Sequence, residues 1–348
     1  MPDCMAFQTL ISEMAAAYDG GIIHSQLSER MKSKKMKKIK SLASLALILV
    51  LLASVLTGCG KNNGKSGKAA IVFTDMAGRE VSLEKAAEKI VALEPSDCEI
   101  LYAIGAGNTL VGRGEYCDYP AEVFDIPAVQ SGSETNIEAI IDLAPEVVIM
   151  TVMAQNEDQI NALEKAGIKV VVTNAQDING IYDCVNMIGK VTGKEDGAAS
   201  VVSQMKSAFD TIKKEGYGAG KTVYFEVSPL QWGLWAAGSG TFMNEAAQMI
   251  GLKNIFGDQA GWLEVSEEQV IAADPDYIVT ITMYFGEGPT PAEEICSREG
   301  WGALKAVVNG NIINIQDNSL SRPSPRLVDG ITAMNDFIAE SLAQDAAA

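Results

Sequence analysis

Histidine is almost absent from this 348-residue chain, which contains a single one, His24, close to its start. Residues 25–348 therefore offer no imidazole group. Ser-His-Asp and Cys-His catalysis need that ring as a base, and His-based zinc sites and His-ligated haem need it as a ligand. His-dependent catalytic residues, His-based metal sites and a His-ligated haem cofactor are therefore not expected in the part of the chain that follows His24.

Basic residues are also scarce. The chain has 27 Lys and Arg against 45 Asp and Glu, which gives a formal net charge of −18. Proteins that bind nucleic acid neutralise phosphates with Lys and Arg, and so present basic patches. The acidic balance therefore argues against nucleic acid as a partner.

Long apolar runs are limited to one, at residues 42–56, and it follows a basic run at residues 31–40. The apolar run is too short to span a bilayer comfortably but suits the core of a secretory signal peptide. We interpret Met31 or Met36 as the true start, and residues 1–30 as an upstream extension without a structural role. Residues 1–58 are thus predicted to be extension and signal peptide.

The signal ends in Leu56-Thr57-Gly58-Cys59, which resembles the lipobox of bacterial lipoproteins. In that family the cysteine is acylated and becomes the first mature residue, so the resemblance implies lipidation of Cys59. Several acyl chains give stable anchoring. Residues 59–70 would then be the lipidated cysteine and a flexible, Gly-rich tether, holding the protein at the extracytoplasmic face of the cell membrane.

The four cysteines that follow Cys59 have no spacing that indicates which of them pair. Cys98, Cys117, Cys184 and Cys296 lack C-x-x-C spacing and are scattered along the chain. Export permits disulfides, but four separate thiols fit the sequence as well, and their connectivity cannot be deduced from it.

An internal repeat divides the mature chain. E-A-I-I-D-L-A-P-E-V-V-I (138–149) matches E-Q-V-I-A-A-D-P-D-Y-I-V (268–279) at a constant spacing of 130 positions. Each copy predicts a short helix that ends before proline, followed by a buried strand. Between the copies, residues 194–216 carry one apolar stripe at helical spacing, with acids at the start and lysines at the end. We expect two lobes, at 71–193 and 217–348, bridged by one long helix at 194–216.

Strands and helices alternate in both predicted lobes, which indicates α/β lobes with a mostly parallel sheet flanked by helices. A hairpin at 71–83 looks like an edge hairpin. Strands are predicted at 90–93, 110–112, 147–150, 170–173, 222–227, 277–282 and 312–314, and helices at 97–104, 137–143, 155–166, 242–250, 267–273 and 329–343. In open sheets of this type ligands bind beyond the carboxyl ends of the strands.

From Ile90 to about Met334 the chain resembles the substrate-binding proteins of bacterial ABC importers for ferric siderophores and vitamin B12. The motifs are I-V-A-L-E-P-S-D-C-E-I-L (90–101), G-A-G-N-T-L-V-G (105–112), C-D-Y-P (117–120), N-I-E-A-I-I-D-L-A-P-E-V-V-I (136–149), V-S-E-E-Q-V (265–270) and S-R-P-S-P-R (321–326). The resemblance implies a class III periplasmic-binding-protein fold, a ligand bound between the lobes and no catalysis.

Aromatic and cationic side chains near predicted strand ends are the candidate ligand-binding residues. Tyr116 and Tyr119 flank Cys117-Asp118, where the resemblance implies ligand-facing aromatics. Trp232, Trp235 and Trp262 are predicted on Gly-punctuated loops, where they would stack on a ligand or seal the lobe edge. Arg322 and Arg326 lie in a Pro-stiffened loop, and a guanidinium fits carboxylate, hydroxamate or phosphate oxygens. Each arginine could instead cap the following helix or pair with Asp329.

Glu138 and Glu268 occupy corresponding positions in the two copies of the repeat. An acid in the first turn of a helix suits the helix dipole, whereas the resemblance implies that each carboxylate docks onto arginines of a membrane permease.

The expected function is capture of an iron(III)-siderophore-type chelate by a monomeric lipoprotein that delivers it to an ABC importer permease and its ATPase. A corrinoid ligand is the alternative. A surface receptor or sensor ectodomain without transport is the alternative of a different class.

Overall fold

The computed structural model describes residues 70–347 apart from 153–156. The predicted signal peptide, Cys59 and most of the tether lie outside the described residues. Within the described part, none of the helices combines the length and apolar character that crossing a membrane requires. It opens with strands β1 (Ile71–Thr74) and β2 (Glu80–Leu83), which pair antiparallel. This hairpin is a two-stranded sheet of its own rather than the edge of a larger one.

The first lobe is built on a five-stranded parallel sheet. Its order is β5 (Ala128–Val129), β4 (Leu110–Gly114), β3 (Ile90–Ala92), β6 (Val147–Thr151) and β7 (Lys169–Thr173). Alternate residues enter two apolar clusters, with Ile90 in one and Val91 in the other. Such two-sided burial is what strands of a parallel sheet covered on both faces require. The helical segments are α4 (Pro95–Ala103), η2 (Gly107–Thr109), η3 (Ala121–Asp125), α5 (Ile137–Asp142), α6 (Glu157–Lys165) and α7 (Ile178–Thr192).

Helix α7 was missed in the sequence. It begins after Asp177, whose side chain accepts a hydrogen bond from the Gly180 amide at 2.6 Å, and it ends at Gly193 with φ of 65°. Its interior contains Gly180 and Gly189 among β-branched and aromatic residues, which are weak helix formers. Packing rather than propensity stabilises this helix, because most of its side chains are buried against the core and α8.

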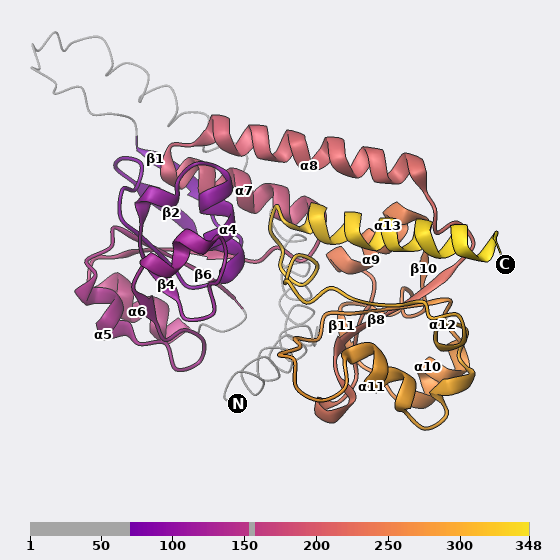
Figure 1. The fold of residues 1–348 in the computed structure, drawn as a ribbon. Coiled ribbons are helices and arrows are strands. Elements are labelled where there is room, and N and C mark those ends of the chain that lie inside the picture. The colour runs from indigo at the N-terminus through magenta and orange to yellow at the C-terminus, as the bar shows by residue number, and fades with distance from the viewer. Residues whose placement is uncertain (1–69, 153–156, 348) are drawn as a thin grey trace, which may run out of the picture. The chain divides into compact units, whose positions relative to one another are not determined.

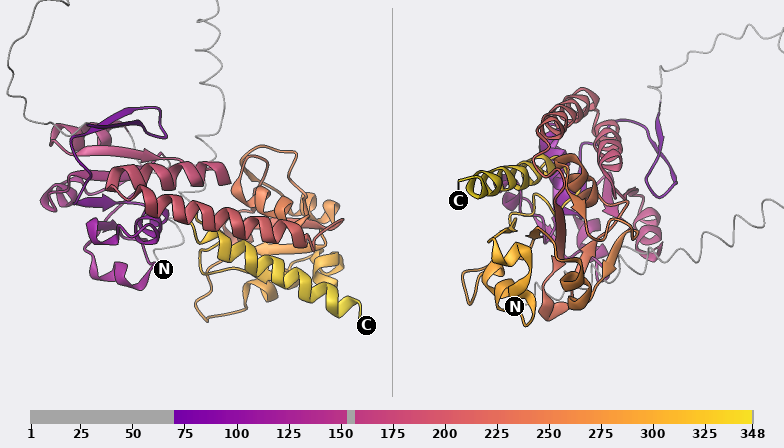
Figure 2. Two further views of the ribbon diagram at one scale, coloured as in Figure 1. Left: turned by 90° about the horizontal axis from the view of Figure 1, so that it is seen from above. Right: turned by 90° about the vertical axis from the view of Figure 1, so that its right-hand side faces the viewer.

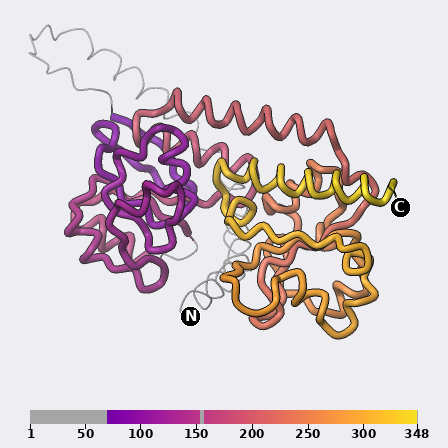
Figure 3. Tube along the Cα trace, in the orientation of Figure 1, coloured from indigo at the N-terminus to yellow at the C-terminus, as the bar shows by residue number. Residues whose placement is uncertain are grey.

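Helix α8 (Glu195–Glu215) confirms the predicted long helix. Its buried stripe is Ala198, Val202, Met205, Phe209 and Ile212. The helix contacts α4 and α7 of the first lobe, and also α9 (Phe242–Ile250) and α13 (Leu327–Asp345) of the second. Figure 2 shows α13 running alongside it. It therefore bridges both halves, and Figure 3 follows the chain across it.

The second lobe contains a six-stranded mixed sheet. Its order is β11 (Trp262–Glu264), β9 (Trp235–Ala237), β8 (Thr222–Ser228), β12 (Tyr277–Thr280) and β13 (Ile312–Asn314), with β10 (Lys253–Asn254) paired to β8. Strands β8, β10, β12 and β13 pair in parallel, whereas β9 and β11 are antiparallel. The remaining helical segments are η4 (Leu230–Trp232), α10 (Glu267–Ala273), α11 (Pro291–Ser297), η5 (Trp301–Ala303) and α12 (Lys305–Val308). The expected two-lobed, mostly parallel α/β architecture is confirmed.

The internal repeat reappears as α5 with β6 and α10 with β12. Its two copies share one unusual backbone feature. Ala144 and Asp274 occupy equivalent positions, each directly before a proline, and both have positive φ, at 47° and 45°. Non-glycine residues rarely adopt this conformation, so the shared turn marks a common local plan in the two lobes.

Candidate functional site

Three loops come together where strands of the two lobes end. One follows β3 and enters α4, one follows β4 and carries Asp118, and one follows β13 and carries Arg322. The first two belong to the first lobe and the third to the second. Ligands of open parallel sheets bind beyond such carboxyl ends, so this junction is the candidate site.

Arg322 lies at the centre of this junction. Its Nη1 donates to Glu99 Oε1 at 2.9 Å and also to Asp118 Oδ1, while Nη2 donates to Asp118 Oδ2 at 3.1 Å. Only 13% of its side chain is exposed. Burial lowers the pKa of Arg322, but Asp118 and Glu99 outweigh that effect and the pKa is raised. The guanidinium thus forms a two-pronged bond to a carboxylate of the other lobe, a strong type of ion pair.

Glu99 is the buried anchor of the same junction. It lies in α4 with 3% exposure, and its carboxylate accepts hydrogen bonds from Arg322, from Ser324 Oγ and from Arg326 Nη1, the last at 3.2 Å. A buried carboxylate needs such partners, because an unpaired charge in the interior is costly. We call Glu99 and Asp118 of the first lobe, with Arg322, Ser324 and Arg326 of the second, the interlobe clasp.

Arg326 closes the clasp against an aromatic ring. Its guanidinium carbon lies 3.9 Å from the centre of the Tyr119 ring, and its Nη2 contacts Asp317 Oδ2 at 3.3 Å. Arg326 is also the residue that precedes α13, which begins at Leu327, two residues earlier than predicted. Arg322 Nη2 also donates to the Tyr116 carbonyl oxygen at 3.4 Å. The structure therefore brings four of the predicted residues together, Tyr116, Tyr119, Arg322 and Arg326, and it pairs both arginines with acids other than Asp329.

The predicted tryptophans lie elsewhere in the second lobe, and two of them are not on loops. Trp235 is in β9 and Trp262 in β11, so the loop assignment was wrong for both; Trp232 ends the short segment η4. Trp262 is 7% exposed and packs edge-on against Phe242 at 5.5 Å between ring centroids. Its Nε1 donates to Gln176 Oε1 of the first lobe at 3.3 Å. Trp262 therefore already has close partners on both sides of the lobe junction.

Four of the exposed apolar side chains follow the ends of two strands. Tyr116 and Tyr119, after β4, are 42% and 45% exposed. Met283 and Phe285, after β12, are 48% and 81% exposed. The sequence indicated that a loop follows β12 there, but no motif marked Met283 or Phe285. Only their exposure on the folded protein distinguishes them from core residues.

A second ion network was also missed in the sequence. Arg298 is 7% exposed and binds both oxygens of Glu226, at 2.6 and 3.0 Å, while its Nη2 also contacts Glu294. Burial raises the pKa of Glu226, and the Arg298 contact opposes that rise. The Arg298 guanidinium stacks 4.5 Å from the Trp301 ring centre, and Trp301 Nε1 donates to Glu267 at 2.8 Å. This network fixes the start of α10, the helix that carries Glu268.

Glu138 and Glu268 lie where the repeat predicted them, in the first turns of α5 and α10, and both are exposed. Each helix start is capped. The Asn136 side chain accepts from the Ala139 amide at 3.0 Å, and Ser266 forms a capping box with Gln269. The pKa of Glu268 is lowered, first by a hydrogen bond with the Ser266 side chain and then by one with its own backbone. The two carboxylates are therefore exposed on helix starts that capping holds in place.

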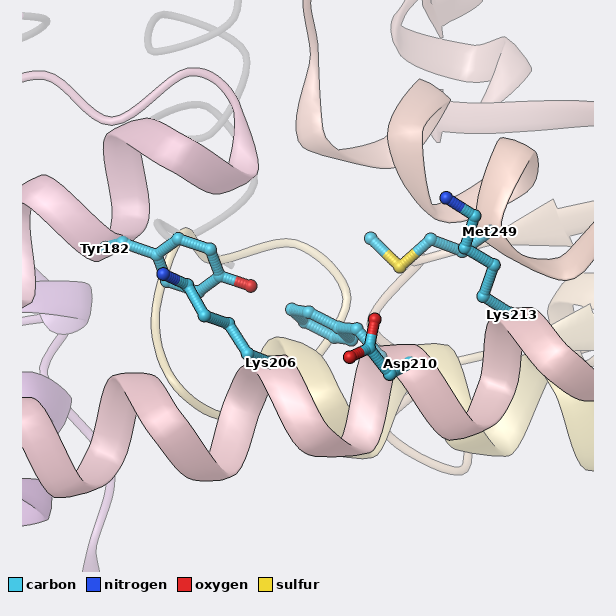
Figure 4. A pocket seen from close by; sticks show the side chains of 6 residues that line it. Tyr182, Lys206, Asp210, Lys213 and Met249 are labelled. Atoms are coloured by element: carbon cyan, nitrogen blue, oxygen red, sulfur yellow. The ribbon is translucent and has the colours of Figure 1, made fainter.

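Two surface cavities lie away from the clasp. One of about 260 Å³ is lined by Tyr182 of α7, by Lys206, Phe209, Asp210 and Lys213 of α8, and by Met249 of α9 (Figure 4). Lys206 Nζ lies 4.9 Å from the Tyr182 ring centre. The other, of about 370 Å³, is lined by residues 244–258 around β10. Neither is formed by the loops of the clasp. The candidate ligand site is placed at the lobe junction because strand-end loops of both lobes meet there.

Two α/β lobes with a bridging helix and loops that meet at the strand ends define a two-lobed solute-binding protein. Residues 90–318 match the model of the periplasmic binding protein family, to which this chain belongs. The chain is 32% identical to the ABC transporter substrate-binding lipoprotein YvrC of Bacillus subtilis, over 83% of this chain and 94% of that protein. It is 29% identical to the vitamin B12-binding protein of Salmonella paratyphi A, over 70% and 87% of the two chains.

Solved structures have the same fold. A possible iron-binding periplasmic solute-binding protein from Staphylococcus epidermidis aligns with a TM-score of 0.61 at 30% identity, covering 73% of this chain and 99% of that one. The periplasmic vitamin B12 binding protein of Vibrio cholerae aligns with a TM-score of 0.62 at 23% identity, covering 74% and 98%. The second likeness concerns the fold alone.

Proposed function

We propose that this protein is the extracytoplasmic substrate-binding lipoprotein of an ABC importer and that it binds a large metal chelate between its lobes. The observation that carries the proposal is the interlobe clasp, which joins the strand-end loops of both lobes beside exposed aromatic side chains. Family membership and the relative named as a lipoprotein support the same conclusion. No catalytic step is part of this function.

The charge of the clasp bears on which chelate is bound. Within the clasp, Arg322 and Arg326 contribute two positive charges, and Glu99 and Asp118 contribute two negative ones. Asp317, which pairs with Arg326 beside the clasp, adds a third negative charge. An anionic siderophore would have to displace Asp118 from Arg322 in order to use that guanidinium. A corrinoid with neutral amide edges would leave the ion pairs intact and rest on the exposed rings. Together with relatives named for vitamin B12, this balance favours a corrinoid over the iron(III)-siderophore chelate.

Titration of the purified protein with cyanocobalamin and with a ferric trihydroxamate, followed by calorimetry, tests the ligand class. Binding of cyanocobalamin with a Kd of about 1 μM or below, and no heat from the ferric chelate, would support the corrinoid. The reverse pattern would restore the siderophore prediction. Heat from neither compound would contradict the proposed ligand class.

Variants of the clasp distinguish the two chelates further. If Arg322 binds an anionic ligand, Arg322→Ala should weaken binding by about 1.5–3 kcal/mol, roughly ten- to a hundredfold in Kd. Asp118→Asn should then tighten it, because a competing carboxylate is removed. With a neutral corrinoid, Arg322→Ala should have a small effect that does not depend on salt. Asp317→Asn is the matched control, because Asp317 pairs with Arg326 rather than with Arg322.

Two further elements of the function rest on the sequence and on exposure. Cys59 would carry the lipid anchor, although it lies outside the described residues. Glu138 and Glu268, one on each lobe, would dock onto basic residues of the permease, whose ATPase drives uptake.

A further inference from the structure

Two buried thiols meet beneath the loop that carries Asp118. Cys98 lies in α4 and Cys117 in the loop after β4, and both are fully buried. Both sulfurs approach the same carbonyl oxygen, that of Ala92, at 3.7 Å from Cys98 and 4.0 Å from Cys117. Two thiols that share one acceptor lie close to each other, although 19 positions separate them in the sequence.

The fold brings this pair together through neighbouring strands. Ala92 of β3 is the register partner of Arg113 of β4, so the two chains leave the sheet side by side. Gly114 then passes so near the first chain that a Cβ there would lie 2.0 Å from the Leu93 carbonyl oxygen. The backbone of the two neighbouring strands therefore brings the two loops close together.

Arg113 holds the second loop in this position. Its guanidinium Nη1 donates to the carbonyl oxygens of Gly114, Glu115 and Cys117, at 3.2, 3.3 and 3.0 Å. With the Cys117 amide bonded to the Gly114 oxygen at 3.1 Å, the chain curls around the guanidinium. This curl keeps the Cys117 side chain turned inward toward Cys98.

We propose that Cys98 and Cys117 form an intramolecular disulfide that ties the Asp118 loop to helix α4. The reaction needs a disulfide donor, for which a low-molecular-weight disulfide such as oxidised glutathione suffices. One protein thiolate attacks a glutathione sulfur and releases one glutathione thiol; the second protein thiolate then attacks the mixed disulfide and releases the other. The protein loses two protons and two electrons, and the donor disulfide is reduced to two thiols.

The other described cysteines have different surroundings. The Cys184 thiol donates to Asp97 Oδ1 at 3.9 Å, and Cys296 is exposed on α11. A shared metal ion does not explain the pair, because the described residues contain no cluster of three or more His, Cys, Asp or Glu side chains suited to one. Cys184 and Cys296 therefore serve as internal controls.

The thiols react only when the loop is open. The pKa of Cys98 is raised well above its usual value, first by its hydrogen bond with Cys117 and then by burial. A neutral, buried thiol is a poor nucleophile, so oxidation belongs to folding or to transient opening of the loop. Once formed, the disulfide would hold Asp118 near Arg322. This consequence depends on the contacts of the clasp and not on which ligand the protein binds.

Refolding of the full-length protein tests the proposal directly. The protein is unfolded in urea with reductant, refolded with reduced and oxidised glutathione, alkylated and digested with trypsin. Cleavage after Arg113 separates the two cysteines, so the disulfide would join peptide 90–113 to peptide 114–165. Mass spectrometry should find this linked pair, and it should disappear after reduction.

Variants make the outcome decisive. Cys184→Ala should retain the linked pair, whereas Cys117→Ala should lose it. The oxidised wild type should also unfold several degrees above its reduced form, and Cys184→Ala should keep that difference. Separate, fully alkylated peptides from correctly refolded protein would overturn the proposal. Linkage of either peptide to 170–190, which contains Cys184, would overturn it as well.

Discussion

Asp97 is a buried acid whose ionisation should couple stability to pH. It lies in the first turn of α4 with 1% exposure, and burial raises its pKa to about 7, against hydrogen bonds from Thr173 and Cys184. In the unfolded chain the same carboxyl titrates near pH 4. Between these values the folded protein holds a proton that the unfolded chain has lost. The free energy of unfolding should therefore fall as pH rises through this window.

Asp97→Asn should remove that dependence. Wild type should lose about 2–3 kcal/mol of unfolding free energy between pH 5 and pH 8 through this group. The variant has no carboxyl to ionise there, so its decline should be smaller by that amount. Urea denaturation at both pH values measures the difference, with Asp336→Asn, an exposed position in α13, as the control. Equal declines in wild type and Asp97→Asn would refute the assignment.

Single residues show why part of the site could be predicted. Arg322 and Arg326 were recognisable because two guanidinium groups in a Pro-stiffened loop are unusual in an acidic chain. Their partner Glu99 was not, because it lies 223 positions from Arg322 and only the meeting of the lobes joins them. Phe285 and Met283 could not be singled out either, since a short apolar stretch looks the same whether it is buried or exposed.

Among the elements, α8 depends on a glycine where it crosses α4. A Cβ at Gly197 would lie 2.3 Å from the Ile104 carbonyl oxygen at the end of α4, a backbone atom that cannot turn away. In an isolated helix alanine would be favoured over glycine by up to about 1 kcal/mol. At this crossing the clash should outweigh that preference.

Gly197→Ala should therefore destabilise the protein by about 1–3 kcal/mol, the usual cost of overpacking. Ser203→Ala, at an exposed position of the same helix, should change stability by no more than about 0.5 kcal/mol. Denaturant unfolding of both variants gives the comparison. A Gly197→Ala protein as stable as wild type would show that α8 can move away from α4 without cost.

Some helices and strands could be predicted from a local sequence pattern, and others could not. Helix α8 and the α5–β6 and α10–β12 units were predicted because their apolar spacing and caps lie within short windows. Helix α7 was missed because its glycines and β-branched residues give no helical preference of their own. The antiparallel strands β9 and β11 were missed because each has only three residues, and their pairing is set by neighbours distant in the sequence.

In the whole molecule, the repeat produces a pair of equivalent acidic positions, which neither lobe has alone. It places Glu138 and Glu268 on equivalent, capped helix starts, one on each lobe, and both are exposed. Neither carboxylate belongs to the clasp. Contact with a permease through these positions can therefore be disrupted without altering the residues proposed to hold the ligand, which separates an importer component from a receptor that only presents its ligand.

Glu138→Lys combined with Glu268→Lys should abolish uptake while the Kd for the ligand stays within about twofold. Each exposed ion pair contributes only about 0.2–1 kcal/mol, so the single variants should be partly active, whereas reversal at both lobes adds repulsion from a basic permease surface. Uptake by cells that express the importer, measured beside calorimetry on the purified variants, checks both halves of the prediction. Glu164→Lys, at an exposed acid of α6 that contacts Arg79, controls for the change of charge. Normal uptake by the double variant would favour a receptor, or docking through another surface, because ligand capture alone does not require these two carboxylates.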